Sequence, residues 1–271
     1  MLCNNDIRDN SVSRPTDTCR LCLKVRPLCK SHLVPKANFK TLRATGKKNP
    51  HPLLISGGVV RTTSAQTQEY LLCDECEQRL RINGEDWVLS NCYRGEGEFN
   101  IRKVLLAAEP WYGDQDIQIF KASAVPEIAI TPIIYFGLSV FWRAAVRDWR
   151  LPGVPIIRID LGPYEEPLRR YLLAESAFPD RMALNVGVSS TTDVASYFIL
   201  PMSGNDSGFH YHKFSVPGMQ FLLFVGSRMP AEFQVINTAP ATESLISVYP
   251  RAEQMEIADL AQLLQRRRES R

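Results

Sequence analysis

The chain has 271 residues, of which 45% are hydrophobic and 23% charged, and its net charge is +3. This composition excludes wholesale disorder and a fibrous repeat, and the length suits one large or two modest globular domains. The most apolar stretch, residues 128–142, is shorter than the roughly twenty residues that a membrane span needs, so we expect a buried helix and no membrane partner. The polar N-terminus lacks the apolar core of a secretion signal, which predicts a cytoplasmic protein.

We expect residues 1–17 to be a flexible arm and residues 18–98 to be a small domain that depends on metal. The second segment is too polar, and too often broken by Pro and Gly, to build a core of its own. It carries two Cys-x-x-Cys pairs, which are Cys19, Cys22, Cys73 and Cys76. Paired cysteines in a reducing compartment indicate metal binding, and four thiolates are the ligand set of a closed structural zinc site. The alternative, a redox pair, is disfavoured because no strand-helix redox pattern surrounds either pair.

Positive charge is concentrated near the N-terminus, where residues 1–60 hold eleven Lys or Arg against three Asp. Such a basic surface attracts polyanions through the release of counterions, so we expect a nucleic-acid partner. The alternative is an ordinary solvated loop surface. The candidate phosphate-contacting residues are Lys36, Lys40, Arg43, Lys47 and Lys48.

Residues 99–271 are expected to form a second, α+β domain of unknown function. Residues 99–108 suit a short helix or strand and are followed by a turn at 110–113. Apolar periodicity predicts a helix over 131–150 and an amphipathic helix over 163–174 that packs against it. Short runs rich in Val, Ile, Phe and Tyr predict an antiparallel sheet, with a turn at 203–208 and a closing helix at about 252–267. The predicted strands are 183–188, 196–202, 210–216, 220–225 and 233–237.

Residues between and beside the cysteine pairs resemble a known family. Ser31 and His32 are followed by Leu-Val-Pro, Leu-Leu leads directly into Cys73, and Glu77 comes directly after the second pair. This order is similar to that of the HNH (ββα-metal) endonucleases of treble-clef type over about residues 19–87. The similarity to an HNH-like group of uncharacterised bacterial proteins extends further, through Trp-Arg-Ala at 142–144 and Leu-Gly-Pro-Tyr-Glu-Glu at 161–166.

The resemblance implies an N-terminal zinc-bound treble clef and assigns roles to four residues. His32 matches the general base that activates water, and imidazole suits that task because it titrates near neutrality. Glu77 stands at a metal-binding position, where a carboxylate suits catalytic Mg²⁺ or Mn²⁺. Ser31 stands at a second metal-binding position, and Gln68 occupies the place of the amide that orients the base. Arg81 replaces the other metal-binding histidine of the family.

Two functions follow from these residues. The first is a metal-dependent endonuclease that hydrolyses phosphodiester bonds, with His32 and Glu77 as catalytic residues. The alternative is a non-catalytic zinc-stabilised module that binds nucleic acid or protein, with the C-terminal sheet as a surface for a protein partner. A separate candidate, His210 and His212 on one strand face, has the spacing of a transition-metal pair, but hydrogen-bonded strand histidines are the favoured interpretation.

Overall fold

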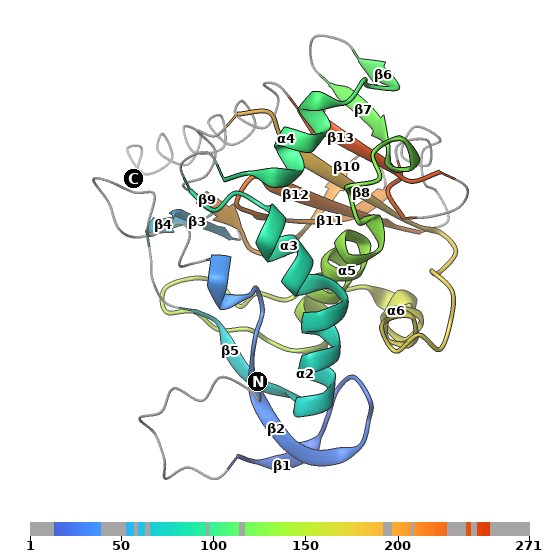
Figure 1. Cartoon of the computed structure of the whole chain (residues 1–271). Helices are drawn as coiled ribbons and strands as arrows, with labels where there is room; N and C mark the ends of the chain where they lie inside the picture. Colours follow the sequence, from blue (N-terminus) through green and yellow to red (C-terminus); the bar gives the residue numbers. More distant parts are fainter. Residues whose placement is uncertain are drawn as a thin grey trace.

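The computed structural model describes residues 14–38, 53–56, 59–62, 66–95, 98–113, 117–191, 197–206, 209–226, 237–239 and 243–249. Within them the chain has a mixed α+β fold (Figure 1). The helices are α2 (Asp74–Leu80), η1 (Arg81–Glu85), α3 (Asp86–Asn91), α4 (Asn100–Ala107), η2 (Ala122–Ala124), α5 (Ile130–Val146), η3 (Gly162–Tyr164) and α6 (Glu165–Leu172). The strands are β1 (Thr16–Thr18), β2 (Val25–His32), β3 (Leu53–Ser56), β4 (Val59–Thr62), β5 (Gln68–Cys73), β6 (Tyr112–Gly113), β7 (Gln118–Lys121), β8 (Met182–Ser189), β9 (Tyr197–Ile199), β10 (Met202–Asp206), β11 (Phe209–Val216), β12 (Met219–Val225) and β13 (Leu245–Tyr249).

A small antiparallel sheet has the order β1-β2-β5. The first cysteine pair lies between β1 and β2, and the second begins at the last residue of β5. A tight turn connects β1 to β2, in which Cys19 N–H donates to the carbonyl of Lys24 at 2.9 Å and Leu23 N–H donates to the carbonyl of Cys19 at 2.8 Å. Strand β2 pairs with β5, so that His32 lies opposite Gln68. Because β5 runs directly into α2, the second cysteine pair lies at a strand-to-helix junction beside the turn.

A π-helical segment, η1, joins α2 to α3 in one helical stretch. Its Gly84 packs against α5, where an added Cβ would lie 2.8 Å from the backbone nitrogen of Phe136. Glycine therefore allows a closer approach of the two helices than any side chain would. Short π-helical segments occur frequently at functional sites, and this one brings Glu85 to the face of α5.

Helix α5 is the central element of the described structure and confirms the predicted buried helix. All its side chains from residue 133 to residue 145 are buried. Figure 1 shows α5 between the helical stretch that contains α2 and the large sheet, where Gly137 packs against Phe221. The helix ends at Val146, short of the predicted residue 150, because Trp149 instead pairs with Ile157 through two backbone hydrogen bonds of 3.0 Å. None of the helices in the described ranges has the length and apolar character needed to cross a membrane.

The large sheet has the order β10-β11-β12-β8-β13-β7-β6. Its strands confirm three predicted segments, at 183–188, 210–216 and 220–225. The sheet is mixed instead of purely antiparallel, because β13 pairs in parallel with β8. Strands β6 and β7 precede α5 in the chain and add to the edge beyond β13. The local sequence could not predict their place in the sheet, because β7 pairs with a strand more than a hundred residues away.

The structure refines four of the predicted segments. Residues 99–108 are helical as α4, and the amphipathic segment 163–174 consists of η3 and the shorter α6, which contacts α5 as expected. The predicted strand 196–202 is divided between β9 and the start of β10. Residues 203–206 of the predicted turn at 203–208 belong instead to β10, and residues 207–208 lie outside the described residues. Strand β10 lies at the edge of its sheet, where polar side chains can stay in solvent.

A single hydrophobic cluster of buried side chains runs from the N-terminal sheet to the large sheet. In addition, β3 pairs in parallel with β9, which joins a segment before residue 98 to one far beyond it. The boundary between residues 18–98 and 99–271 therefore stays a prediction about folding units. Of the predicted flexible arm at 1–17, the part up to residue 13 lies outside the described residues, whereas Thr16 and Asp17 belong to β1 and pair with β2. Strand residues 233–236 and the closing helix at 252–267 also lie outside the described residues.

Candidate metal centre and adjoining polar site

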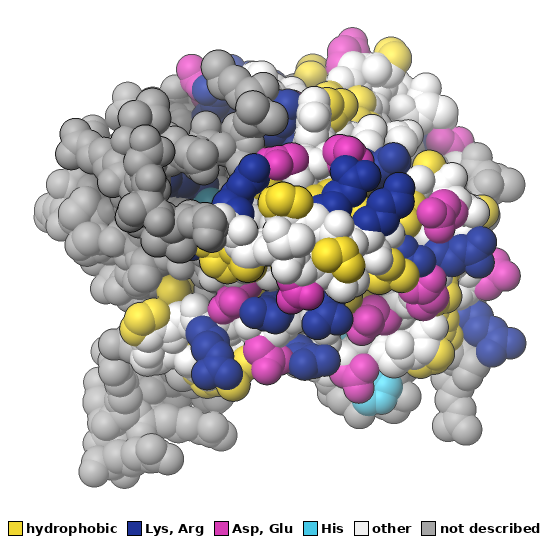
Figure 2. All heavy atoms as spheres, turned by 90° about the horizontal axis from the view of Figure 1, so that it is seen from below, with side chains coloured by type: hydrophobic (Ala, Val, Ile, Leu, Met, Phe, Trp, Pro, Cys, Tyr) yellow, Lys and Arg dark blue, Asp and Glu magenta, His cyan; other side chains and the backbone are white. Residues whose placement is uncertain are grey.

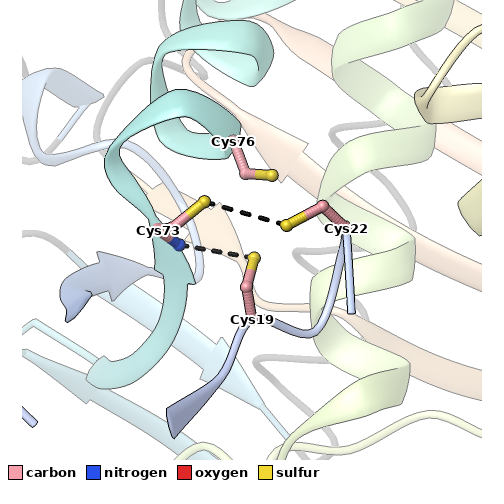
Figure 3. Close-up of side chains that lie close together, drawn as sticks. All are labelled: Cys19, Cys22, Cys73 and Cys76. Carbon is pink, nitrogen blue, oxygen red and sulfur yellow. Dashed lines mark hydrogen bonds between the residues drawn. The ribbon is translucent and has the colours of Figure 1, made fainter. Parts of the chain in front are cut away.

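The four predicted cysteines form one cluster, whose sulfur atoms all lie within 4.8 Å of one another. Figure 3 shows Cys19 and Cys22 on the turn after β1, Cys73 at the end of β5 and Cys76 in the first turn of α2. The Sγ atoms of Cys22 and Cys73 are 3.9 Å apart. A tetrahedral site with metal–sulfur bonds of about 2.3 Å requires sulfur atoms roughly 3.8 Å apart. The arrangement can therefore hold a metal ion with four thiolate ligands.

The chemistry of the cluster fits a metal ligated by thiolates. The backbone N–H of Cys73 donates to Sγ of Cys19 at 3.4 Å, a contact that favours the ionised sulfur. Without a metal, the hydrogen bond between Cys19 and Cys76 lowers the pKa of the Cys19 thiol to about 4 and raises the pKa of the Cys76 thiol. A bound metal ion would deprotonate the thiols that coordinate it. In the described part of the chain, no second group of three or more His, Cys, Asp or Glu side chains is close enough to hold a metal ion.

Ser31 and Glu77, which the resemblance places at metal-binding positions, lie beside each other. The hydroxyl of Ser31 on β2 donates to the carboxylate of Glu77 on α2. Burial raises the pKa of Glu77, while the charge of Arg143 and the hydrogen bond from Ser31 oppose that rise. The pairing of β2 with β5 sets the position of Ser31, and the first turn of α2 after Cys73 sets the position of Glu77.

An ion pair between Arg143 of α5 and Glu85 of η1 completes this buried cluster. The Arg143 side chain is only 2% exposed, and its guanidinium also donates to the carbonyl oxygen of His32 at 3.3 Å. Burial lowers the pKa of Arg143, but the charges of Glu85 and Glu77 more than offset this effect and raise the pKa overall. A permanent positive charge therefore acts on both carboxylates from inside the fold.

The imidazole of His32 is half-buried between two glutamine side chains. Its Nε2 atom lies 3.0 Å from Oε1 of Gln66 and 2.7 Å from Nε2 of Gln68. A ring nitrogen cannot donate and accept at once, so only one of these contacts is a hydrogen bond in a given tautomer. Burial lowers the pKa of His32, as do the charges of Lys36 and Arg143, against the opposing hydrogen bond to Gln66. The imidazole is therefore neutral at neutral pH.

The structure places Ser31 on β2 against Glu77 on α2, and His32 on β2 against Gln68 on β5, as two separate contacts. Lys36 lies near enough to His32 for its charge to act on the imidazole. Arg81, which replaces a family histidine, forms an ion pair of 2.8 Å with Asp86. The other candidate phosphate-contacting residues, Lys40, Arg43, Lys47 and Lys48, lie outside the described residues.

The described part of the basic N-terminal segment is partly neutralised by the start of α2. Arg14 pairs with Asp74 at 2.9 Å, and Arg26 pairs with Glu75 at 2.5 Å. Figure 2 shows the corresponding mixture on the face seen from below, where Lys and Arg side chains lie interspersed with Asp and Glu side chains. On this face the described residues therefore offer localised positive charges interspersed with acidic side chains.

Sequence reasoning missed Arg143, Glu85 and Gln66. Arg143 had a signal, since it is the only charged residue within α5, and a lone charge in a buried helix needs a partner. Glu85 and Gln66 carried no local signal, because their roles depend on contacts with distant segments.

The histidine pair on β11 shows no metal site. Nδ1 of His212 lies 2.9 Å from the hydroxyl of Ser203, and Nε2 is buried without a hydrogen-bond partner. His210 is exposed, and no third ligand lies beside the pair among the described residues. Burial lowers the pKa of His212 to about 4, with a further contribution from the charge of His210. The hydrogen-bonded interpretation of His212 is therefore confirmed.

No protein-family model, curated protein or solved structure matches the chain. Inference about its function therefore rests on the residues and their geometry.

Proposed function

We propose that this chain is a zinc-stabilised, HNH-like protein that binds nucleic acid without cutting it. The cysteine turn, the β2–β5 pairing and the strand-to-helix step at Cys73 support an HNH-like treble clef. In that arrangement Cys19, Cys22, Cys73 and Cys76 hold the zinc ion. Four protein ligands leave no open coordination position, so the ion stabilises the fold and supplies no reactive water.

The observation that carries the non-catalytic proposal is the ion pair of Arg143 with Glu85 beside Glu77. The guanidinium places a fixed positive charge close to both carboxylates, and the hydroxyl of Ser31 already binds Glu77. A divalent cation at Glu77 would have to overcome this charge with one buried carboxylate as its protein anchor. Hard cations favour sites with several oxygen ligands and retained waters, so the surroundings of Glu77 do not fit catalytic Mg²⁺ or Mn²⁺.

Exposed arginines on and near the zinc turn, which is the turn that carries Cys19 and Cys22, support nucleic acid as the ligand. Guanidinium groups match the geometry of phosphate oxygens and remain charged at any physiological pH. Binding of this kind weakens as salt rises, because each phosphate contact releases counterions. Cys19, Cys22, Cys73 and Cys76 are free thiols that can bind metal, whereas Cys29 is disulfide-bonded.

Phosphodiester hydrolysis remains the second candidate because of the state of His32. Its imidazole is neutral, and Gln66 and Gln68 contact Nε2, so Nδ1 is the ring nitrogen that makes no hydrogen bond to a described residue. As a general base, His32 would remove a proton from water while that water attacks the phosphorus atom, and the leaving oxygen would take up a proton in turn.

Incubation of the purified protein with plasmid, single-stranded DNA and RNA at low salt distinguishes the two candidates. Each substrate is tested with Mg²⁺, Mn²⁺ or EDTA, with His32→Ala alongside. His210→Ala is the matched control because His210 is an exposed histidine on a different sheet. We expect intact substrate in every reaction. Metal-dependent cutting that His32→Ala abolishes and His210→Ala retains would replace the binding proposal with the nuclease.

A further inference from the structure

A charged cleft of about 550 Å³ lies between the zinc turn, β5, α5 and α6. Its volume is within the range of small-ligand sites. The lining contains four carboxylates and five arginines, which are Arg20, Arg147, Arg150, Arg158 and Arg169. Such a concentration of guanidinium groups suits an anionic ligand.

Three of the four carboxylates are already paired with arginines of the same cleft. Arg147 contacts Glu69 at 3.2 Å, and Arg158 contacts Asp148 at 2.9 Å. Arg169 contacts Glu166 with two nitrogens, at 2.6 and 2.7 Å. These pairs cancel most of the charge on the walls and hold the side chains in place.

Arg20 and Arg150 remain as the exposed arginines of the cleft that form no ion pair with any described residue. Glu165 is the carboxylate of the lining that forms no ion pair in the same described ranges. The uncompensated charge in the cleft is therefore positive. The lining has no aromatic side chain on which a base could stack, and its apolar members are Leu23 and Val146. A protein partner would need larger apolar anchors, whereas a phosphate group needs only the two guanidinium groups.

The backbone around Arg20 is fixed from two sides. Its N–H donates to the carbonyl of Leu71 at 3.1 Å, and Arg169 of α6 donates to the carbonyl of Leu21 at 2.6 Å. Because Arg20 lies between two cysteines of the metal cluster, the same turn that holds the metal positions this arginine. The cleft is thus part of the metal-stabilised structure.

The cleft also adjoins the polar site at His32. Arg147 is the residue directly after α5, and Glu69 is the neighbour of Gln68 on β5.

We propose that Arg20 and Arg150 bind phosphate groups of a nucleic-acid backbone in this cleft. This inference rests on the proposed function and names the surface that performs it. Contacts to phosphate without stacking or base-edge contacts predict binding with little dependence on base sequence.

Fluorescence anisotropy with labelled single-stranded DNA, duplex DNA and RNA tests the assignment. We expect Arg20→Ala/Arg150→Ala to weaken binding by about tenfold or more. The slope of log K against log salt should become shallower by about 2, because two phosphate contacts are lost. The matched control is Arg94→Ala/Lys103→Ala, which removes two exposed positive charges outside the cleft. The control should bind within about twofold of wild type at physiological salt.

A gain of affinity provides a result that misfolding cannot imitate. Glu165→Gln removes the unpaired carboxylate and should tighten binding about threefold, whereas Glu109→Gln, outside the cleft, should not. Wild-type affinity in both the Arg20/Arg150 and the Glu165 variants would overturn the cleft assignment and leave the proposed function standing. Failure of the wild-type protein to bind any of the three probes would overturn the proposed function and the cleft assignment together.

Discussion

Arg143 on α5 and Glu85 on the π-helical segment η1 form an ion pair inside the fold. The pair joins the helical stretch that follows the second cysteine pair to the central helix that packs on the large sheet. It also places a positive charge beside Glu77 and a donor on the carbonyl oxygen of His32. The geometry of the polar site is therefore coupled to the packing of α5.

Removal of Arg143 should destabilise the protein strongly. Arg143→Met leaves Glu85 in a largely buried position without its partner, which typically costs about 3–5 kcal/mol of unfolding free energy. Urea unfolding measures the change. The double variant Arg143→Met/Glu85→Gln should lose less than the sum of the two single variants, because it removes both charges of the pair and leaves neither one unpaired. Additive losses would show that the two side chains are not coupled.

The metal cluster predicts one zinc ion per chain. Cys19→Ser should purify without zinc and unfold at least about 10 °C lower, since a structural zinc site contributes several kcal/mol and each kcal/mol shifts the midpoint by roughly 2–4 °C. Metal analysis and thermal melting provide the readouts. Cys92→Ser is the matched control, because Cys92 is a buried cysteine outside the cluster and its variant should keep the zinc. Zinc retained in Cys19→Ser would contradict the four-cysteine site.

His212 should make stability fall in mild acid. Its folded pKa of about 4 lies below the ordinary value near 6.5, so between these pH values the unfolded chain binds a proton that the folded chain does not. The contribution of neutral His212 is fully present above about pH 6.5 and is lost as pH falls towards 4, by on the order of 3 kcal/mol. The charge of His210 strengthens this shift and that of Asp160 opposes it.

Urea unfolding of wild type and His212→Gln across this pH range isolates the effect. The difference between the two stability curves should change by about 3 kcal/mol between pH 7 and pH 4. His210→Gln, at the exposed neighbour, should leave most of the pH dependence intact. Parallel curves for wild type and His212→Gln would contradict the prediction.

Gly84 is expected to tolerate no side chain. A Cβ at this position would lie 2.8 Å from the backbone nitrogen of Phe136, and backbone atoms cannot move aside as a flexible side chain can. Gly84→Ala should therefore cost about 1–3 kcal/mol in chemical unfolding. At Gly113 an added Cβ would make ordinary contacts of 3.6 Å or more, so Gly113→Ala should be nearly neutral. Equal stability of the two variants would contradict the close helix contact.

Sequence predicted the elements whose signals are local. The apolar run of α5, the runs rich in Val, Ile, Phe and Tyr that became β8, β11 and β12, and the spacing of Cys19–Cys22 and Cys73–Cys76 each carry their own pattern. The order of the large sheet could not be predicted in the same way. Its parallel β8–β13 pair and the addition of β7 depend on contacts between segments far apart in the chain.

The residues of the polar site likewise fall into those that the sequence indicated and those that only tertiary contacts bring to the site. Motif order indicated Ser31, His32, Gln68 and Glu77 because they lie near the cysteines in sequence. Arg143 comes from a helix more than sixty residues after Glu77, and only the packing of α5 against η1 brings its charge to the site. The arginine cleft was missed for the same physical reason, since segments far apart in the chain form its walls.

Titration of the wild-type protein against labelled DNA and RNA at increasing salt tests the central claim most directly. The account predicts saturable binding to at least one of these probes at 50 mM salt, and an affinity that falls steeply, by about tenfold or more, as salt rises to 200 mM. Absence of binding at the lower salt concentration, by a protein that is folded and contains zinc, would contradict the proposal that this chain is a nucleic-acid-binding protein.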